Sequence, residues 1–375
     1  MLAGPPILAV AAAAPGLAGW GGPSAGAVAP DPPRSIAVCE PRGPGAAAGR
    51  TAAAGAWWRT EPSIDAAGTL DGWLLQVGAP GAATSELRLP PATTVTGPSG
   101  GRVVVASEPV AAGDSSIVRI VDAAVGCATE ITVQGRIARR AIADPAGDGV
   151  LAHLLEPGAR ADLGVWRVGA DGSIAGRLVE PLPDSLREAA GMDSVWVTDL
   201  RLDAEGRRLA VQSCDPDACV TRLLDLSSGE VAVLDGEGQG PIIGFAGLQL
   251  LTWGACHGLP CPVAAWNVAA GVARTVVPAT SSAALSGDGR TLAVVLPGPD
   301  DGRELVAIDL RSGVARSLGA AGQDDLPLSG AAGSIAGLET AGAAVAIGHA
   351  GLVPTPRGLE GSAPSYNLPD REVQR

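Results

Sequence analysis

Four of the six cysteines form two pairs with the same internal spacing. Cys214 and Cys219 flank the segment DPDA, and Cys256 and Cys261 flank HGLP. Such pairs can form disulfides or bind zinc, and His257 would add a nitrogen ligand to the second pair. Zinc sites favour cysteines with two residues between them, and here there are four. Residues that flank a four-residue turn face each other across a hairpin. The spacing therefore favours two disulfides, with zinc as the alternative.

The other two cysteines, Cys39 and Cys127, complete an even number and are expected to pair. This bond would close a long loop, and its entropic gain would be about 4 kcal/mol. Two buried free thiols are the alternative. A set of disulfides is typical of exported proteins.

No local motif indicates a catalytic or metal centre. The segment 97–101 fits the G-x-S-x-G pattern of serine hydrolases, but a strand is predicted after Ser99 where that motif needs a helix. The acidic turns at 235–240 and 299–302 lack the ligand pattern of a calcium loop. Separate predicted elements carry the three histidines, His153, His257 and His349. We therefore expect no cofactor and no metal.

Binding needs only a few well-placed side chains. The candidates for such anchors are Trp196, Asp199, Arg201, Trp253 and His257. Along the predicted strand 195–202, alternation places Asp199, Arg201 and Val197 on one face, and Trp196, Thr198 and Leu200 on the other. An Asp199–Arg201 pair on an inner strand would line a central channel, and a self-satisfied pair at a strand end is the alternative.

A repeated turn positions these side chains. The segment DLSSG at 225–229 recurs as NVAAG at 267–271 and as DLRSG at 309–313, in steps of 42 residues. Each copy joins two apolar strands, so it is predicted to form a hairpin in which glycine takes a positive φ and Asp or Asn hydrogen-bonds the turn backbone. The two cysteine pairs are related by the same step, so they occupy equivalent hairpins.

The same register distinguishes core residues from candidate anchors. Trp266 corresponds to Leu224 and Ile308, so we expect it in the core between repeats. His153 follows an apolar run and is expected to pack in the core or at a rim. His349, near the end of the last repeat, would face the channel.

A second marker precedes each repeat. DAEGRRLAV at 203–211 matches SGDGRTLAV at 286–294, and together the markers describe a four-stranded antiparallel meander of about 40–45 residues, the size of a propeller blade. These segments resemble the S-x-D-G-x-x-L-A-F/V core of TolB-type, WD-like propeller repeats. The resemblance implies an all-β β-propeller and carries no information about function.

The predicted organisation has four parts. We assign 1–27 to a signal peptide, 28–63 to an N-terminal segment with a ring-closing strand, 64–354 to the propeller, and 355–375 to a proline-containing tail. Counting predicts seven blades, with six or eight as alternatives. Because an open sheet edge invites aggregation, Ser35–Cys39 is expected to pair with the last blade as its outer strand.

Composition and the N-terminus narrow the functional classes. The net charge of −13 argues against nucleic acid and against anionic membranes. The apolar run at 7–14 is too short and too interrupted by proline for membrane insertion, and its place before an A-x-A site indicates a secreted or periplasmic protein. We expect a non-catalytic binding or scaffold module for a protein, peptide or cell-wall glycan, acting as a monomer or as a subunit of an exported complex. The alternative is a propeller enzyme, a lactonase-like hydrolase or a lyase, with its site over the channel.

Overall fold

The computed structural model describes residues of one compact unit, Pro33–Arg375. The described residues are 34–39, most of 57–321, and the short stretches 337–340, 343–348, 351–354 and 365–366. Apart from one short helix, α1 (Asp184–Ala189), the regular elements of this part are strands.

The first two sheets combine N-terminal strands with later hairpins. The first has the order β1-β5-β4-β3, from β1 (Arg34–Ser35), β3 (Trp57–Ile64), β4 (Leu70–Gly78) and β5 (Ser85–Leu89). The second has the order β2-β9-β8-β7-β6, from β2 (Ala37–Val38), β6 (Thr94–Ser99), β7 (Arg102–Ala106), β8 (Ser116–Asp122) and β9 (Cys127–Val133).

The next three sheets are regular four-stranded meanders. The third contains β10 (Ile137–Ala143), β11 (Val150–Leu155), β12 (Asp162–Val168) and β13 (Ile174–Val179). The fourth contains β14 (Trp196–Leu202), β15 (Arg208–Cys214), β16 (Cys219–Asp225) and β17 (Val231–Leu234). The fifth contains β18 (Gln239–Ala246), β19 (Gln249–Gly254), β20 (Cys261–Asn267) and β21 (Val272–Thr280).

The last two sheets complete the set of seven among the described residues. The sixth contains β22 (Ser282–Leu285), β23 (Thr291–Pro297), β24 (Arg303–Asp309), β25 (Ala315–Ala321) and, at its outer edge, β29 (Ser365–Tyr366). The seventh contains β26 (Gly337–Thr340), β27 (Ala343–Gly348) and β28 (Gly351–Pro354). The seventh sheet has three described strands, whereas a complete blade has four, so the number of complete blades stays a prediction.

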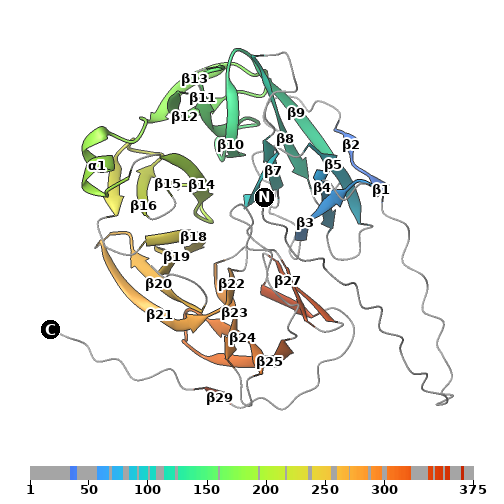
Figure 1. Cartoon of the computed structure of the whole chain (residues 1–375), viewed down its shortest axis with the longest axis vertical. Coiled ribbons are helices and arrows are strands. Elements are labelled where there is room, and N and C mark those ends of the chain that lie inside the picture. Colours follow the sequence, from blue (N-terminus) through green and yellow to red (C-terminus); the bar gives the residue numbers. More distant parts are fainter. Residues whose placement is uncertain are drawn as a thin grey trace, which may run out of the picture. The chain divides into compact units, whose positions relative to one another are not determined.

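The sheets of this unit follow one another around an axis, as Figure 1 shows. The strands nearest the axis, which we call the inner strands, include β6, β10, β14, β18 and β22, and consecutive members from β10 to β22 contact each other. The first sheet meets the seventh through β3, which contacts β26 and β27. The fold is the all-β propeller that the repeat predicted.

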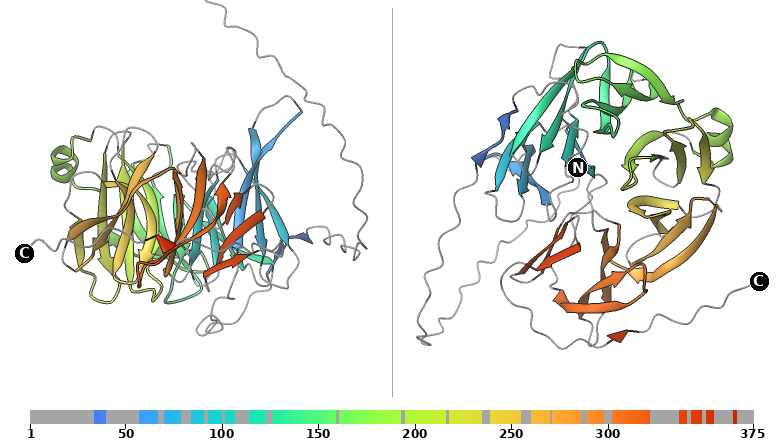
Figure 2. Two further views of the ribbon diagram at one scale, coloured as in Figure 1. Left: turned by 90° about the horizontal axis from the view of Figure 1, so that it is seen from below. Right: turned by 180° about the vertical axis from the view of Figure 1, so that it is seen from behind.

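The N-terminal segment lies on the first two sheets (Figures 1 and 2). β1 pairs in parallel with β5, and β2 pairs in parallel with β9. A disulfide between Cys39 and Cys127, with 5.0 Å between the Cα atoms, holds this segment at the start of β9. The expected pairing of Ser35–Cys39 with the last blade is therefore wrong. The first sheet also begins at Trp57, N-terminal to the expected boundary, because β3 is its inner strand.

The three repeated turns have the predicted hydrogen bonds. Oδ1 of Asp225 accepts from the backbone N–H groups of Ser227 at 2.9 Å and Ser228 at 3.1 Å. Asn267 and Asp309 accept equivalent bonds in the following two sheets. The hydroxyl of Ser227 and the N–H groups of Ser228 and Ser227 lower the pKa of Asp225 to about 2.

Apolar side chains pack between neighbouring sheets. Trp266 is buried, as are Leu224 and Ile308 at the equivalent positions, which confirms the core assignment made from the repeat. The indole N–H of Trp266 donates to Oγ1 of Thr252 at 3.0 Å, so its only polar group is satisfied. The core between the third and fourth sheets includes Leu151 and Leu209.

Candidate functional site

The first cysteine pair closes its hairpin. Cys214 and Cys219 are paired directly across β15 and β16 and form a disulfide, with 4.1 Å between the Cα atoms. The turn between them is fixed by Asp215, whose carboxylate accepts from the N–H of Ala218 at 2.7 Å. Cys261 is also disulfide-bonded, and its expected partner Cys256 lies outside the described residues. The favoured interpretation of the CDPDAC segment as a disulfide hairpin is confirmed.

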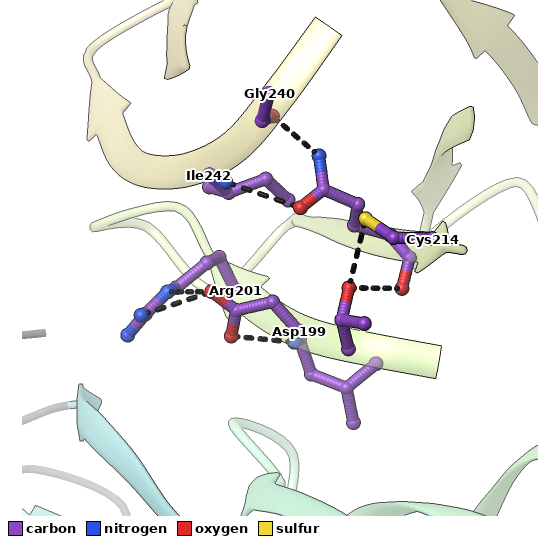
Figure 3. A network of polar contacts seen from close by, with 8 residues as sticks. Asp199, Arg201, Cys214, Gly240 and Ile242 are labelled. Carbon is purple, nitrogen blue, oxygen red and sulfur yellow. Dashed lines mark hydrogen bonds and ion pairs between the residues drawn. The ribbon is translucent and has the colours of Figure 1, made fainter. Parts of the chain in front are cut away.

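An ion pair lies on the inner strand of the fourth sheet (Figure 3). Oδ2 of Asp199 accepts from Nε of Arg201 at 3.1 Å and contacts its Nη2 at 3.0 Å. Oδ1 accepts from the backbone N–H of Leu200 at 2.9 Å. The side chains of Asp199 and Arg201 keep 19% and 13% of their exposure. Both charges are therefore oriented on a strand and partly accessible.

A β-bulge produces this arrangement. Val197 pairs with Ser213 and Asp199 pairs with Gln212, so Thr198 is an extra residue in β14. Because the bulge shifts the alternation by one residue, Val197 and Leu200 both pack into the core between the third and fourth sheets. The expected placement of Val197 on the face of Asp199 is therefore wrong.

Gln212 connects the fourth sheet to the fifth beside the ion pair (Figure 3). Its side-chain amide donates to the carbonyl of Gly240 at 2.9 Å and accepts from the N–H of Ile242 at 3.1 Å. It also donates to Oγ1 of Thr221 at 3.1 Å. Gln212 is buried, so the pairing partner of Asp199 is held in place by two sheets.

The neighbouring inner strand carries two more charges. β10 contains Arg139, a bulged residue, and Arg140, which is 9% exposed. Burial lowers the pKa of Arg140, the charge of Asp199 raises it, and the charges of Arg139 and Arg201 lower it further. The sequence analysis did not single out these arginines, although two adjacent charges inside the apolar segment 137–143 were a usable signal.

The described part of the structure does not bring the other predicted anchors to the Asp199–Arg201 pair. Trp253 is half-buried and packs against the core between the fifth and sixth sheets. Trp196 belongs to β14, but its side chain is outside the described part, as are His257 and His349. Ser99 pairs with Arg102 in the hairpin of β6 and β7, so a strand follows it as expected and the context of a nucleophile elbow is missing.

A second polar cluster is buried between the third and fourth sheets. His153 is 1% exposed, which confirms its expected place in the core, and its Nε2 lies 2.9 Å from Oδ1 of Asp162. Nη1 of Arg222 donates to the carbonyl of Glu180 at 2.6 Å. Burial raises the pKa of Asp162, but the hydrogen bond and charge of His153, the N–H of Gly164 and the charge of Arg222 outweigh it, so the pKa lies below its ordinary value.

The Asp162 interaction predicts a stability loss in acid. A carboxyl with a depressed pKa in the folded state contributes stability above its unfolded pKa and loses it as the pH falls through the folded pKa. We expect Asp162→Asn to lower the free energy of unfolding by about 1–2 kcal/mol at pH 7 and to remove part of the decline below pH 4. Urea unfolding at pH 7, 4 and 3 measures both effects.

The exposed residue Asp184 supplies the control for this comparison. Its carboxylate lies 2.9 Å from Arg187 and its side chain is 80% exposed, so Asp184→Asn should change stability by well under 1 kcal/mol at every pH. Identical acid profiles for Asp162→Asn and the wild type would contradict the assigned role of Asp162.

Among the described residues, no three Asp, Glu, His or Cys side chains come together as a metal-ligand set. In that part, no helix has the length and apolar character needed to cross a bilayer.

Comparison with known proteins gives similarity of fold alone. No protein-family model matches the sequence, and no curated protein is similar to it. A structure from a study of two prolyl endopeptidases is similar at a TM-score of 0.47 and 12% identity over 79% of this chain, which spans 47% of that protein's length. A putative TolB from Agrobacterium tumefaciens is similar at a TM-score of 0.41 and 12% identity, with 63% of this chain and 83% of that chain covered. A nidogen/laminin complex is similar at a TM-score of 0.43 and 12% identity, with 71% of this chain and 93% of that chain covered.

Proposed function

We propose that this chain is a secreted or periplasmic binding module whose inner strands present a fixed ion pair to a protein, peptide or glycan. The observation that carries the proposal is the Asp199–Arg201 pair, which is partly exposed and held by the N–H of Leu200. Charges that are oriented before binding lose little conformational freedom on contact with a ligand. The two disulfides support an oxidising compartment.

The remaining anchors enter the proposal as additional contacts. Trp196 lies three residues before Asp199 on the same inner strand, and we propose it as an aromatic contact for the ligand. In the sequence, His257 lies between β19 and β20, and Trp253 is the penultimate residue of β19. We assign the polar contacts to Asp199 and Arg201 and expect the aromatic residues to supply apolar area.

Removing both members of the ion pair tests the proposal. A double variant avoids leaving one charge without its partner. We expect Asp199→Ala with Arg201→Ala to weaken binding of a selected peptide or cell-wall glycan fragment about 10- to 100-fold. Ligands are first selected by biolayer interferometry on the immobilised full chain, and the same preparation is assayed against lactones and esters.

The Arg119–Glu130 pair provides the matched control. It joins β8 to β9 at 2.7 Å, and neither of these strands carries the Asp199–Arg201 pair, so Arg119→Ala with Glu130→Ala should leave the affinity unchanged. Failure to select any peptide or glycan would overturn the proposal. Turnover of a lactone or ester that disappears with Asp199 would replace it with an enzymatic function.

A further inference from the structure

Among the inner strands β6, β10, β14, β18 and β22, the charges are concentrated in one place. Strands β6, β10, β14, β18 and β22 contain four charged residues in total, Arg139, Arg140, Asp199 and Arg201. All four lie on the adjacent strands β10 and β14, which contact each other. Three positive charges therefore stand beside one negative charge, in a chain whose net charge is −13.

The two bulges bring these charges to equivalent positions. Arg140 follows the bulged residue Arg139, and Asp199 follows the bulged residue Thr198. In each strand the charged residue stands three positions before the last ladder pair, which is Ala143–Val150 in β10 and Leu202–Leu209 in β14. Arg140 and Asp199 are thus corresponding residues of neighbouring inner strands.

Arg140 is buried without a direct counter-ion among the described residues. It is 9% exposed, and its Nε has no hydrogen-bond partner there. The nearby carboxylate of Asp199 already accepts from Arg201 and from the N–H of Leu200. Burying a guanidinium without a direct acceptor is unfavourable even with the charge of Asp199 nearby, so Arg140 is incompletely satisfied.

A second buried arginine is satisfied through one of its nitrogens, while Nε and Nη2 of Arg222 have no hydrogen-bond partner among the described residues. Arg222 is 3% exposed, and its Nη1 donates to the carbonyls of Glu180 at 2.6 Å and Pro181 at 3.3 Å in the neighbouring sheet. Asp162 adds a negative charge near it. Arg140 has neither carbonyl acceptors of this kind nor a carboxylate of its own in the described structure.

We propose that Arg140 and Arg201 bind an oxyanion, a carboxylate or a phosphate, between β10 and β14. The planar guanidinium group matches both oxyanions through paired N–H donors. An anion here would supply a direct hydrogen-bond acceptor, which Asp199 does not provide to Arg140 in the described structure. This inference rests on the proposed function, because it names the chemical class that the binding site recognises.

The test uses the full chain with inorganic phosphate and with acetate, at constant ionic strength maintained with chloride. We expect the melting temperature of the wild type to rise saturably, by about 4 °C at a concentration one hundred times the Kd. Arg140→Gln should abolish the rise and Arg140→Lys should weaken it, because lysine keeps the charge and loses the paired donors. Arg119→Gln, the control for loss of one positive charge, should respond like the wild type.

Asp199→Asn gives an independent readout that a merely structural role of Arg140 would not produce. Removing the negative charge beside the site should tighten anion binding several-fold, because the repulsion between Asp199 and the anion is lost. This variant and Arg140→Lys keep the proposal testable if Arg140→Gln does not fold.

The outcomes separate the two proposals. No saturable response to either anion, or equal responses of Arg140→Gln and the wild type, would overturn the oxyanion site. A response to acetate alone assigns a carboxylate, and a response to phosphate alone assigns a phosphate. Anion binding without any peptide or glycan binding would refute only the proposed function. Peptide or glycan binding without an anion response would refute only the oxyanion site.

Discussion

Replacing Cys39 and Cys127 together with serine is expected to lower the free energy of unfolding by about 4–5 kcal/mol, because the bond closes a loop with a sequence separation of 88. The pairing that it supports is short, since β2 contributes two residues to the edge of β9. Without the bond, this edge would be exposed to pairing with other chains. Chemical unfolding of protein produced in an oxidising compartment measures the loss, and the melting temperature should fall by roughly 6–7 °C.

The second disulfide is the control for loop length. Cys214 and Cys219 are separated by 5 positions, so replacing both with serine should cost only about 2 kcal/mol. Equal losses for the two double variants would contradict the loop-closure explanation. Higher light scattering of the Cys39/Cys127 variant at its melting temperature would show that the outer edge of the second sheet had become exposed.

Features encoded by local spacing could be predicted from the sequence. The 42-residue step placed the hairpin turns at Asp225, Asn267 and Asp309, and it identified Trp266 as a core residue. Both results follow from local rules, since a turn needs a positive-φ glycine and a strand alternates its faces. The expected partner of the N-terminal strand was wrong because parallel pairing of two-residue strands leaves no pattern in the sequence.

The candidate site was predicted only in part, for a similar reason. Asp199 and Arg201 were recognised because alternation places them together along one segment. The bulge at Thr198 was missed, since nothing in the segment WVTDLRL distinguishes a bulged strand from a regular one. Arg140 was missed because its relation to Asp199 depends on contact between neighbouring sheets, which repeat register alone does not describe.

The second repeat marker contains a glycine whose substitution should have a large effect. Gly289 has a φ of 68°, and a Cβ at this position would lie 2.5 Å from the carbonyl oxygen of Phe245 in the fifth sheet. Gly206, in the matching marker, has a φ of 65° and would place a Cβ 2.6 Å from Cβ of Pro145 in the turn after β10. The marker therefore recurs because its turn packs closely against the preceding sheet.

Gly289→Ala is expected to lower the free energy of unfolding by about 3 kcal/mol, from a left-handed alanine at about 1–2 kcal/mol and displacement of a backbone contact at about 1–3 kcal/mol. Gly313→Ala is the matched control in the same sheet, because Gly313 has a φ of 72° and no atom within 4 Å of the added Cβ. Its cost should be limited to about 1–2 kcal/mol. The difference between the two variants in urea unfolding measures the packing of the turn against the fifth sheet, and equal losses would show that glycine is needed at 289 for its backbone conformation alone.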